Sequence, residues 1–412
     1  MHSSMTTSSG LALAATFDAA AVAASAQCEA CGFHGMVPFY ELSNVPVHSV
    51  LLMRTPEAAA AYQRGDIRLA YCQDCGFVSN VLFDESFNDY GQQYEETQGF
   101  SPTFSTFHRR LVKQLVDRYD ICGKDVIEIG CGKGEFLWLI CTEGNNRGIG
   151  FDPSYIAERG TSTANIRVVQ DLFSDKYADS YEADVVCCKM TMEHIASPRK
   201  LVRAVRRLLA KRPNGLAFFQ IPDFGHILDV AAFWDVYYEH CSYFTADSLR
   251  ALFESEGFEV LTVDREYAGQ YLTVVAKPAA VPQRTASTDS DGFAAHVQSF
   301  AARVRASVQS WEKRIRHYTD KGGRVVLWGG GSKAVAFLST VPVADVVEYA
   351  VDINPYRQGT YLPGSAKRIV APDFLQQYKP DFVVVMNPVY VDEIQRDLRR
   401  LGLSPEVAAL GV

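Results

Sequence analysis

Two pairs of cysteines near the start of the chain have the spacing of a metal site. Cys28 and Cys31 form one C-x-x-C pair, Cys72 and Cys75 form another, and a glycine follows each pair. Four thiolates make the closed tetrahedral set that Zn²⁺ prefers, with no position left for a substrate. We therefore predict a structural zinc site. Because 40 residues separate the pairs, two redox pairs or four buried thiols are the alternatives.

A glycine-rich turn at 130–134 predicts a site for a nucleoside. The turn reads G-C-G-K-G and lies between an apolar run at 125–129 and a helical pattern at 135–141. Glycine lets a ligand approach the backbone where a Cβ atom would block it. The spacing is shorter than the G-x-G-x-x-G of dinucleotide sites, which favours a neutral or cationic nucleoside ligand over a pyrophosphate.

Acidic side chains flank this turn. Glu128 precedes it, and Asp152 ends the next predicted strand, 22 residues after Gly130, where a carboxylate can bind ribose hydroxyls. Asp171 follows the third predicted strand and is our candidate for binding the adenine amino group. The alternative is an ordinary tight turn in which Asp152 caps a helix.

A Y-x-E-H sequence supplies a candidate base. It follows the fifth predicted strand, on the carboxyl side of the sheet, where ligands bind. His240 has an ordinary pKa of about 6.5, so its imidazole can accept a proton at neutral pH. Glu239 or Tyr237 would orient it or stabilise a developing negative charge, and His194 is a second candidate. The alternative is that these side chains serve packing alone.

The strand and glycine-loop pattern occurs a second time, at 324–333. The loop reads G-G-G-S-K and precedes another helical pattern. Because a helix N-terminus and a lysine both attract anions, we expect this loop to hold a group such as a pyrophosphate. Its candidate binding residues are Gly329, Gly331, Ser332 and Lys333. The alternative is a second fold unit used only for packing.

Alternating strands and helices must position these groups. The strands predicted for the first unit are 125–129, 148–151, 166–169, 183–187 and 216–221, with helices such as 104–119 and 201–210. Such alternation predicts an α/β fold of the Rossmann-like, doubly wound class. The second Rossmann-like unit is predicted from a helix at 293–318 and strands at 324–328, 346–351 and 382–386.

The chain has 412 residues, which predicts two or three domains. We divide it into a flexible tail at 1–26, a zinc-binding domain at 27–85, a helical connector and candidate lid at 86–119, the first Rossmann-like domain at 120–276, a linker at 277–292 and a C-terminal Rossmann-like domain at 293–412. The linker is rich in Pro, Ala, Ser, Thr and Asp.

Composition limits the function further. With 48% hydrophobic and 21% charged residues the chain is globular, and its net charge of −8 gives no basic surface for nucleic acid or an anionic membrane. No apolar run reaches about 18 residues. Asp18 interrupts the Ala-rich start and no Lys or Arg precedes Arg54, which argues against a signal peptide. We expect a cytoplasmic protein with a small-molecule partner; the sequence is consistent with a monomer but leaves the oligomeric state open.

The turn and its flanking acids resemble the first motif of class I S-adenosylmethionine-dependent methyltransferases. The resemblance covers about 120–276 and implies S-adenosylmethionine as cofactor. It also implies that the glycines wrap the methionyl part, Asp152 holds the ribose and Asp171 with Leu172 contacts adenine. The glycines concerned are Gly130, Gly132 and Gly134.

The whole set of motifs, over about 28–410, resembles the zinc-containing C-methyltransferases that act on nucleotide-linked keto-deoxysugars. This resemblance implies that the sugar nucleotide lies between the two Rossmann-like domains and that His240 is the base. Tyr237, Glu239 and His194 would line the reaction centre. One departure is the second loop, because the family's G-A-x-G-K-G-N-T reads G-G-G-S-K-A-V-A at 329–336 here.

The function implied is methylation of a carbon next to a ketone, in secondary metabolism or surface-glycan synthesis. Two alternatives stay open. One is an O- or N-methyltransferase of another small metabolite, in which an existing lone pair attacks. The other is a zinc-bearing protein that binds a nucleotide without turnover.

Overall fold

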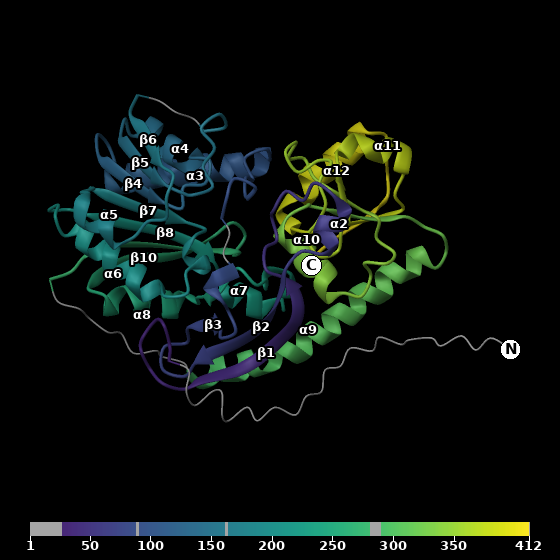
Figure 1. The fold of residues 1–412 in the computed structure, drawn as a ribbon, viewed down its shortest axis with the longest axis horizontal. Coiled ribbons are helices and arrows are strands. Elements are labelled where there is room, and N and C mark those ends of the chain that lie inside the picture. The colour runs from purple at the N-terminus through teal and green to yellow at the C-terminus, as the bar shows by residue number, and fades with distance from the viewer. Residues whose placement is uncertain (1–26, 88–89, 161–163, 281–289, 412) are drawn as a thin grey trace.

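The computed structural model describes residues 27–87, 90–160, 164–280 and 290–411, so the tail predicted at 1–26 lies outside the described residues. Within these ranges the strands form sheets of seven, five and four strands (Figure 1). None of the helices in the described ranges is long and apolar enough to cross a membrane.

The seven-stranded sheet is the first Rossmann-like unit, with strand order β10-β11-β8-β7-β4-β5-β6. All five predicted strands are present and parallel: β4 (Asp125–Ile129), β5 (Arg147–Phe151), β6 (Ile166–Val169), β7 (Val185–Lys189) and β8 (Leu216–Pro222). An antiparallel hairpin of β10 (Phe258–Glu266) and β11 (Tyr271–Pro278) completes one edge. Its turn has left-handed backbone at Tyr267, Ala268 and Gly269, without the Asn-Gly or Asp-Gly step that marks hairpins in a sequence.

Helices cover this sheet, and the first of them follows the predicted periodicity. The helices are α3 (Pro102–Tyr119), α4 (Glu135–Glu143), α5 (Asp175–Ser180), α6 (Pro198–Leu209) and α8 (Ala246–Ser255). Another helix, α7 (Phe224–Asp229), instead belongs to the core that β1 shares with α9. α3 starts at Pro102 because the Ser101 hydroxyl accepts a hydrogen bond from the Phe104 amide. Its buried face includes Phe107 and Leu111, which hold it against the sheet.

The cysteine-bearing segment forms the four-stranded sheet, in the order β1-β2-β3-β9. Its elements are β1 (Met36–Pro46), α2 (Pro56–Ala60), β2 (Arg64–Cys72), β3 (Val78–Asn80) and β9 (Ser242–Tyr243). β9 comes from the chain just after the Y-x-E-H sequence, and Tyr243 pairs with Val78. The cysteine segment therefore pairs with the short strand that follows the candidate base, two residues after His240.

The five-stranded sheet is the second Rossmann-like unit, with the order β14-β13-β12-β15-β16 and all strands parallel. Its strands are β12 (Val325–Trp328), β13 (Tyr349–Val351), β14 (Arg368–Val370), β15 (Phe382–Val385) and β16 (Glu406–Ala409). Its helices are α9 (Ser290–Thr319), α10 (Ser332–Thr340), α11 (Leu375–Tyr378) and α12 (Val391–Arg400). The predicted linker overlaps the end of β11, and its middle, 281–289, lies outside the described residues.

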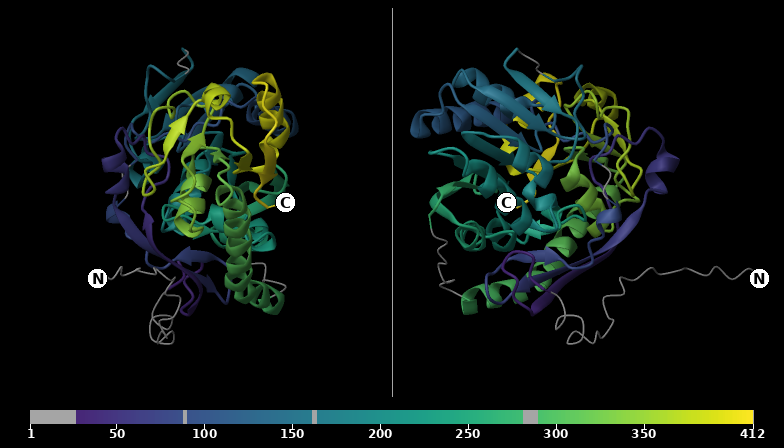
Figure 2. Two further views of the ribbon diagram at one scale, coloured as in Figure 1. Left: turned by 90° about the vertical axis from the view of Figure 1, so that its right-hand side faces the viewer. Right: turned by 60° about the vertical axis from the view of Figure 1, so that its left-hand side comes forward.

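The long helix α9 lies beside β1 in both views (Figures 1 and 2). The rings of Tyr40 on β1 and Phe300 on α9 are 5.2 Å apart, edge to face. One hydrophobic core contains Tyr40, Phe300 and Val325 of β12 together. The cysteine segment is therefore packed onto the C-terminal unit as well as joined to the first one.

Candidate active site

A cavity of about 920 Å³ lies where the carboxyl ends of both parallel sheets meet. From the first sheet it is lined by Gly130 after β4, Asp152 after β5 and Lys189 at the end of β7. From the second it is lined by Gly329 after β12 and Asp352 after β13. Ligands of open α/β sheets bind at such edges, so this cavity can hold a ligand of each unit at once.

The first glycine loop has the backbone that its sequence predicts. Gly130, Gly132 and Gly134 have φ angles of 69°, 53° and 82°, in the left-handed region. A Cβ atom on Gly130 would collide with the Thr191 side chain, and one on Gly132 with the Glu96 carboxylate. Only glycine fits these two positions.

Asp152 lines the cavity and is bound to the loop. Its carboxylate accepts hydrogen bonds from the amide of Gly132, at 2.8 Å, and from the amide of Ser154, at 2.7 Å. The second unit has the same arrangement, because the Asp352 carboxylate accepts hydrogen bonds from the amides of Gly330 and Asn354, each at 2.8 Å. Asp352 was absent from our predicted site, although its place at the end of the second strand of its unit, like that of Asp152, could have identified it.

Glu128 is buried below the loop and lines the cavity. Burial raises its pKa to about 8, although the nearby Lys189 ammonium opposes this. Its Oε2 atom has no hydrogen-bond partner among the described residues. Buried polar atoms normally have a hydrogen-bond partner. The unpaired Glu128 oxygen beside the glycine loop can therefore accept a hydrogen bond from a ligand, such as one from the amino group of S-adenosylmethionine.

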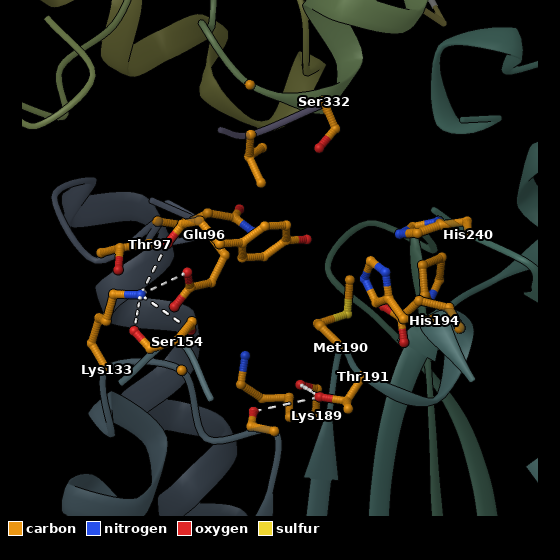
Figure 3. Close-up of a pocket in the computed structure, with 18 of the residues that line it drawn as sticks. Glu96, Thr97, Lys133, Ser154, Lys189, Met190, Thr191, His194, His240 and Ser332 are labelled. Atoms are coloured by element: carbon orange, nitrogen blue, oxygen red, sulfur yellow. Dashed lines mark hydrogen bonds and ion pairs between the residues drawn. The ribbon is translucent and has the colours of Figure 1, made fainter. Parts of the chain in front are cut away.

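Part of the predicted connector covers this loop. The Lys133 ammonium, at the centre of the loop, donates to the carbonyls of Tyr94 (3.0 Å) and Ser154 (3.1 Å) and to the Glu96 carboxylate (3.2 Å). Figure 3 shows this group on one wall of the cavity. Lys133 therefore holds residues 94–97 against the glycine loop.

His240 and His194 lie on the opposite wall (Figure 3). Their rings are 4.8 Å apart and nearly perpendicular, and the Tyr237 ring is 4.1 Å from that of His240. Burial lowers the pKa of both imidazoles, and that of His240 falls further because His194 and Lys333 are near. Both rings are therefore neutral at neutral pH, which is the form a base requires.

Glu239 does not face this cavity, contrary to our prediction that it lines the reaction centre. Its buried carboxylate accepts hydrogen bonds from the Ser49 amide (3.1 Å) and hydroxyl and pairs with His48 Nδ1 at 3.0 Å. His240 Nδ1 has no hydrogen-bond partner among the described residues. Glu239 thus ties the Y-x-E-H segment to residues 48 and 49, from a turn in which the His240 amide donates to the Tyr237 carbonyl at 3.1 Å.

A different carboxyl lies beside the histidines. Glu193 is buried, lines the cavity and has no partner for either oxygen among the described residues. Its carboxyl and one ring nitrogen each of His194 and His240 lie within 4.8 Å of one another. Burial raises the pKa of Glu193 to about 8. The only signal in the sequence was its position directly before His194.

Tyr90 is a further site residue that sequence reasoning missed. Its hydroxyl is 3.2 Å from His194 Nδ1, and it lines the cavity. It comes from the connector, 104 residues earlier in the chain. No local pattern could have linked it to His194.

We predicted that the Asp171 carboxylate binds adenine, but this carboxylate turns away from the cavity. Asp171 is absent from the cavity wall, because its carboxylate accepts hydrogen bonds from Tyr177 (2.6 Å) and Lys176 (2.7 Å), which lower its pKa to about 2. Leu172, the next residue, does line the cavity and is 61% exposed. Of this pair only Leu172 can contact a ligand there.

The second glycine loop lies on the same cavity. Gly329, Gly331, Ser332 and Lys333 all line it. The Lys333 ammonium is already paired with the Asp235 carboxylate, and Ser332 Oγ is 2.8 Å from Ser49 Oγ, within hydrogen-bond distance. Ser49 also donates to Glu239, so one chain of contacts joins the second loop to the Y-x-E-H segment.

The four predicted metal ligands lie together, away from the cavity. Cys28 Sγ is 3.7 Å from Cys75 Sγ and Cys31 Sγ is 3.6 Å from Cys72 Sγ, with all four sulfurs within 4.8 Å of one another. A tetrahedron with Zn–S bonds of about 2.3 Å has edges of about 3.8 Å. None of the described cysteines is in a disulfide. The arrangement thus fits a tetrahedral ion.

Comparison with known proteins agrees with this architecture. The methyltransferase domain family matches residues 104–263, and the C-methyltransferase C-terminal domain family matches 276–403. C-methyltransferase NovU of Streptomyces niveus is 26% identical over 392 residues, which cover 89% of this chain and 91% of that protein. Ubiquinone biosynthesis O-methyltransferase of Neisseria meningitidis is 32% identical over 133 residues, 29% of this chain and 54% of that protein.

Solved structures resemble part of the chain. They include human N-acetylserotonin methyltransferase with S-adenosylmethionine (TM-score 0.35, 13% identity, 43% of this chain and 53% of that one). Another is the Burkholderia thailandensis 1,6-didemethyltoxoflavin-N1-methyltransferase with S-adenosylhomocysteine (TM-score 0.33, 15% identity, 43% of this chain and 81% of that one). With a methyltransferase domain around the glycine loop and a C-methyltransferase C-terminal domain after it, this chain is an S-adenosylmethionine-dependent methyltransferase with the class I fold.

Proposed function

We propose that this enzyme methylates a carbon next to a ketone in a nucleotide-linked keto-deoxysugar. The observation that carries the proposal is the pair of neutral imidazoles, the half-buried His194 and the buried His240, across one cavity from the glycine loop. The C-terminal family match and the relation to a C-methyltransferase over most of the chain support transfer to carbon.

Methylation of carbon needs a carbanion equivalent, and a ketone provides one when its α-proton is removed. His240 is the base in this proposal, because its neutral ring lines the cavity and its pKa is lowered by burial. Such a positioned base contributes about 10²- to 10⁴-fold. S-Adenosylmethionine, when bound, supplies an electrophilic methyl group on its sulfonium.

Tyr237 can stabilise the enolate. Its ring packs against His240 and it lines the cavity. Burial raises its pKa well above the ordinary value, so the phenol keeps its proton and can donate a hydrogen bond to the enolate oxygen.

The nucleotide part of the acceptor would lie on the second glycine loop. α10 begins there, with Gly331 as its N-cap, and helix N-termini favour phosphate groups. A diphosphate would compete with Asp235 for the Lys333 ammonium. The cavity, lined from both sheets, has room for this acceptor beside the donor.

Deuterium exchange tests the enolate directly. We would first find a binder by thermal-shift screening of nucleoside-diphosphate keto-deoxyhexoses with S-adenosylhomocysteine present. In D₂O, proton NMR should then show loss of the α-proton signal with the wild type and no loss with His240→Asn. Binding of a keto-sugar without exchange, or methyl recovered on oxygen or nitrogen in turnover with S-adenosylmethionine, would contradict the proposal.

We also propose that the four cysteines hold Zn²⁺ in a structural role. The purified protein should contain about one zinc per chain by elemental analysis, and Cys72→Ser should lose the zinc and lower the melting temperature. Cys122→Ser is the matched control, since Cys122 is exposed and lies far from the cluster in sequence. Equal zinc content in the two variants would exclude this site.

A further inference from the structure

Lys189 has no role in the chemistry above, yet it lines the cavity. It is the last residue of β7, beside β4, where Cys188 is in register with Ile129. Lys189 is therefore level with Gly130, the first residue of the glycine loop. Figure 3 shows its ammonium directed into the cavity, between the loop and the histidines.

Its ammonium has no polar partner. Among the described residues it makes no hydrogen bond and no ion pair, and it lies over the Phe104 ring, 5.7 Å from the ring centroid. Burial lowers its pKa, while the carboxyls of Glu128 and Glu135 oppose this change. A cation left without a partner inside a cavity is costly unless a ligand supplies an anion.

The other cations of the cavity already have partners. Lys133 is bound by three backbone or carboxylate oxygens and by the Ser154 hydroxyl, and Lys333 is paired with Asp235. Arg357 donates to Asp352 and to the Glu95 carbonyl. Arg357 keeps one free donor, its Nε, but among the described residues around this cavity Lys189 is the ammonium or guanidinium that makes no hydrogen bond or ion pair at all.

The donor needs such a group. Its amino-acid end carries one ammonium and one carboxylate, and its ribose offers hydroxyls. The acidic residues around the first loop, Glu96, Glu128 and Asp152, can accept from the ribose and the ammonium but cannot bind a carboxylate. We propose that Lys189 binds the carboxylate of the methionyl end of the donor.

The charges are consistent with this arrangement. Lys189 and the sulfonium are both cations, and they would repel each other strongly in a cavity of low dielectric. The methionyl carboxylate between them neutralises this repulsion. The inference rests on donor binding at the first glycine loop and is independent of the acceptor proposed above.

A thermodynamic cycle tests the contact without turnover. The two ligands are S-adenosylhomocysteine and S-adenosyl-3-thiopropylamine, which is the same molecule without the carboxylate. Isothermal titration calorimetry would give both Kd values for the wild type and for Lys189→Met, whose side chain has a similar length and no charge. The matched control is Lys200→Met, at an exposed lysine on α6.

We expect the wild type and the Lys200 variant to bind S-adenosylhomocysteine about 10- to 100-fold more tightly than the analogue, as for a hydrogen bond between charged groups. Lys189→Met should bind the two ligands almost equally, and Lys189→Arg should recover part of the preference. If Lys189→Met weakened both ligands by the same factor, or weakened neither, Lys189 would not contact the carboxylate. A variant that bound neither ligand would be replaced by Lys189→Gln in the same cycle.

Discussion

At the scale of single residues, the chemistry of this site depends on which charged groups have partners. The buried Glu239 carboxylate has hydrogen-bond partners in Ser49 and His48, so we assign it a structural role. Glu193 and the ring of His240 are equally buried and have unpaired atoms at the cavity. A buried polar group without a partner lowers the stability of the folded protein, so such groups are the first candidates for a functional role.

His240→Asn should remove the base. We expect kcat to fall by about 10²- to 10⁴-fold, while the Kd of S-adenosylhomocysteine stays the same. Because burial and nearby charges lower the pKa of His240, the wild-type kcat/KM should lose activity only below about pH 6.5 as pH falls. Steady-state kinetics over pH would measure both effects, with His317→Asn, at an exposed histidine on α9, as the control.

Glu193→Gln should change how stability depends on pH. Burial raises the pKa of Glu193 from 4.5 to about 8, so the folded state holds its proton more tightly than the unfolded chain does. The resulting stability is fully present below about pH 4.5 and is lost as pH rises through about 8, by at most about 1.4 kcal/mol per pH unit. Melting temperatures should fall less steeply for the variant than for the wild type between about pH 5 and 8.

The control for this change is Glu158→Gln, at an exposed position after β5. It removes one carboxylate without touching the cavity. Identical slopes for the wild type and Glu193→Gln would mean that Glu193 is ionised in the folded protein.

At the scale of elements, two strand-loop-helix units bring their glycine loops to one cavity. Each loop is held by an acidic residue after the next strand, Asp152 in the first unit and Asp352 in the second. The loops differ in what lies over them. Residues 94–97 pack against the first loop through Lys133, whereas Ser49 contacts the second.

Gly130→Ala should abolish donor binding, because the new Cβ would meet the Thr191 side chain and the backbone has a φ of 69°. Gly123→Ala is a matched control: its φ is 66°, but nothing lies within 4 Å of the added Cβ. It should lose only about 1 kcal/mol of stability from backbone strain. Calorimetry with S-adenosylhomocysteine should show at least a 100-fold weaker Kd for the first variant and an unchanged Kd for the second.

At the scale of the whole molecule, Glu95 joins the two Rossmann-like units. This fully buried carboxylate is bound by Arg159 of the first unit and by Asn354 of the second, at 2.8 Å. Burial by itself would raise its pKa, but the hydrogen bonds from Arg159 and Asn354 lower it below the ordinary value. Arg357 donates to its carbonyl as well. Glu95 is therefore one of the contacts between the units, together with the buried side-chain pair of Gln270 and Asn387.

Glu95→Gln should destabilise the protein by about 1.5–3 kcal/mol, because it removes the charge of a buried carboxylate that accepts hydrogen bonds from Arg159 and Asn354. Chemical denaturation would measure the loss. Asp117→Asn is the control, since it breaks an exposed pair with Lys113 and should change the free energy of unfolding by about 0–1 kcal/mol. Equal effects of the two changes would show that the Glu95 pair does not hold the units together.

The sequence by itself determined the features that depend on near neighbours. The glycine loops, the parallel strands before them and the paired cysteines were all predicted from residues a few positions apart. Backbone sterics and ligand geometry act over such short spans, so local spacing was sufficient. The two Rossmann-like units, each with a strand, a glycine loop and a helix in that order, were predicted from the same local patterns.

Only the tertiary structure decided which side chains meet across long stretches of chain. Glu239 turns to His48, 191 residues away, and Asp171 turns to Lys176 and Tyr177 instead of the cavity. Glu193, Tyr90 and Lys189 join the site because elements from several regions pack around one space. Orientation and burial of this kind depend on the sum of contacts from distant segments, and no spacing rule in one segment contains that information.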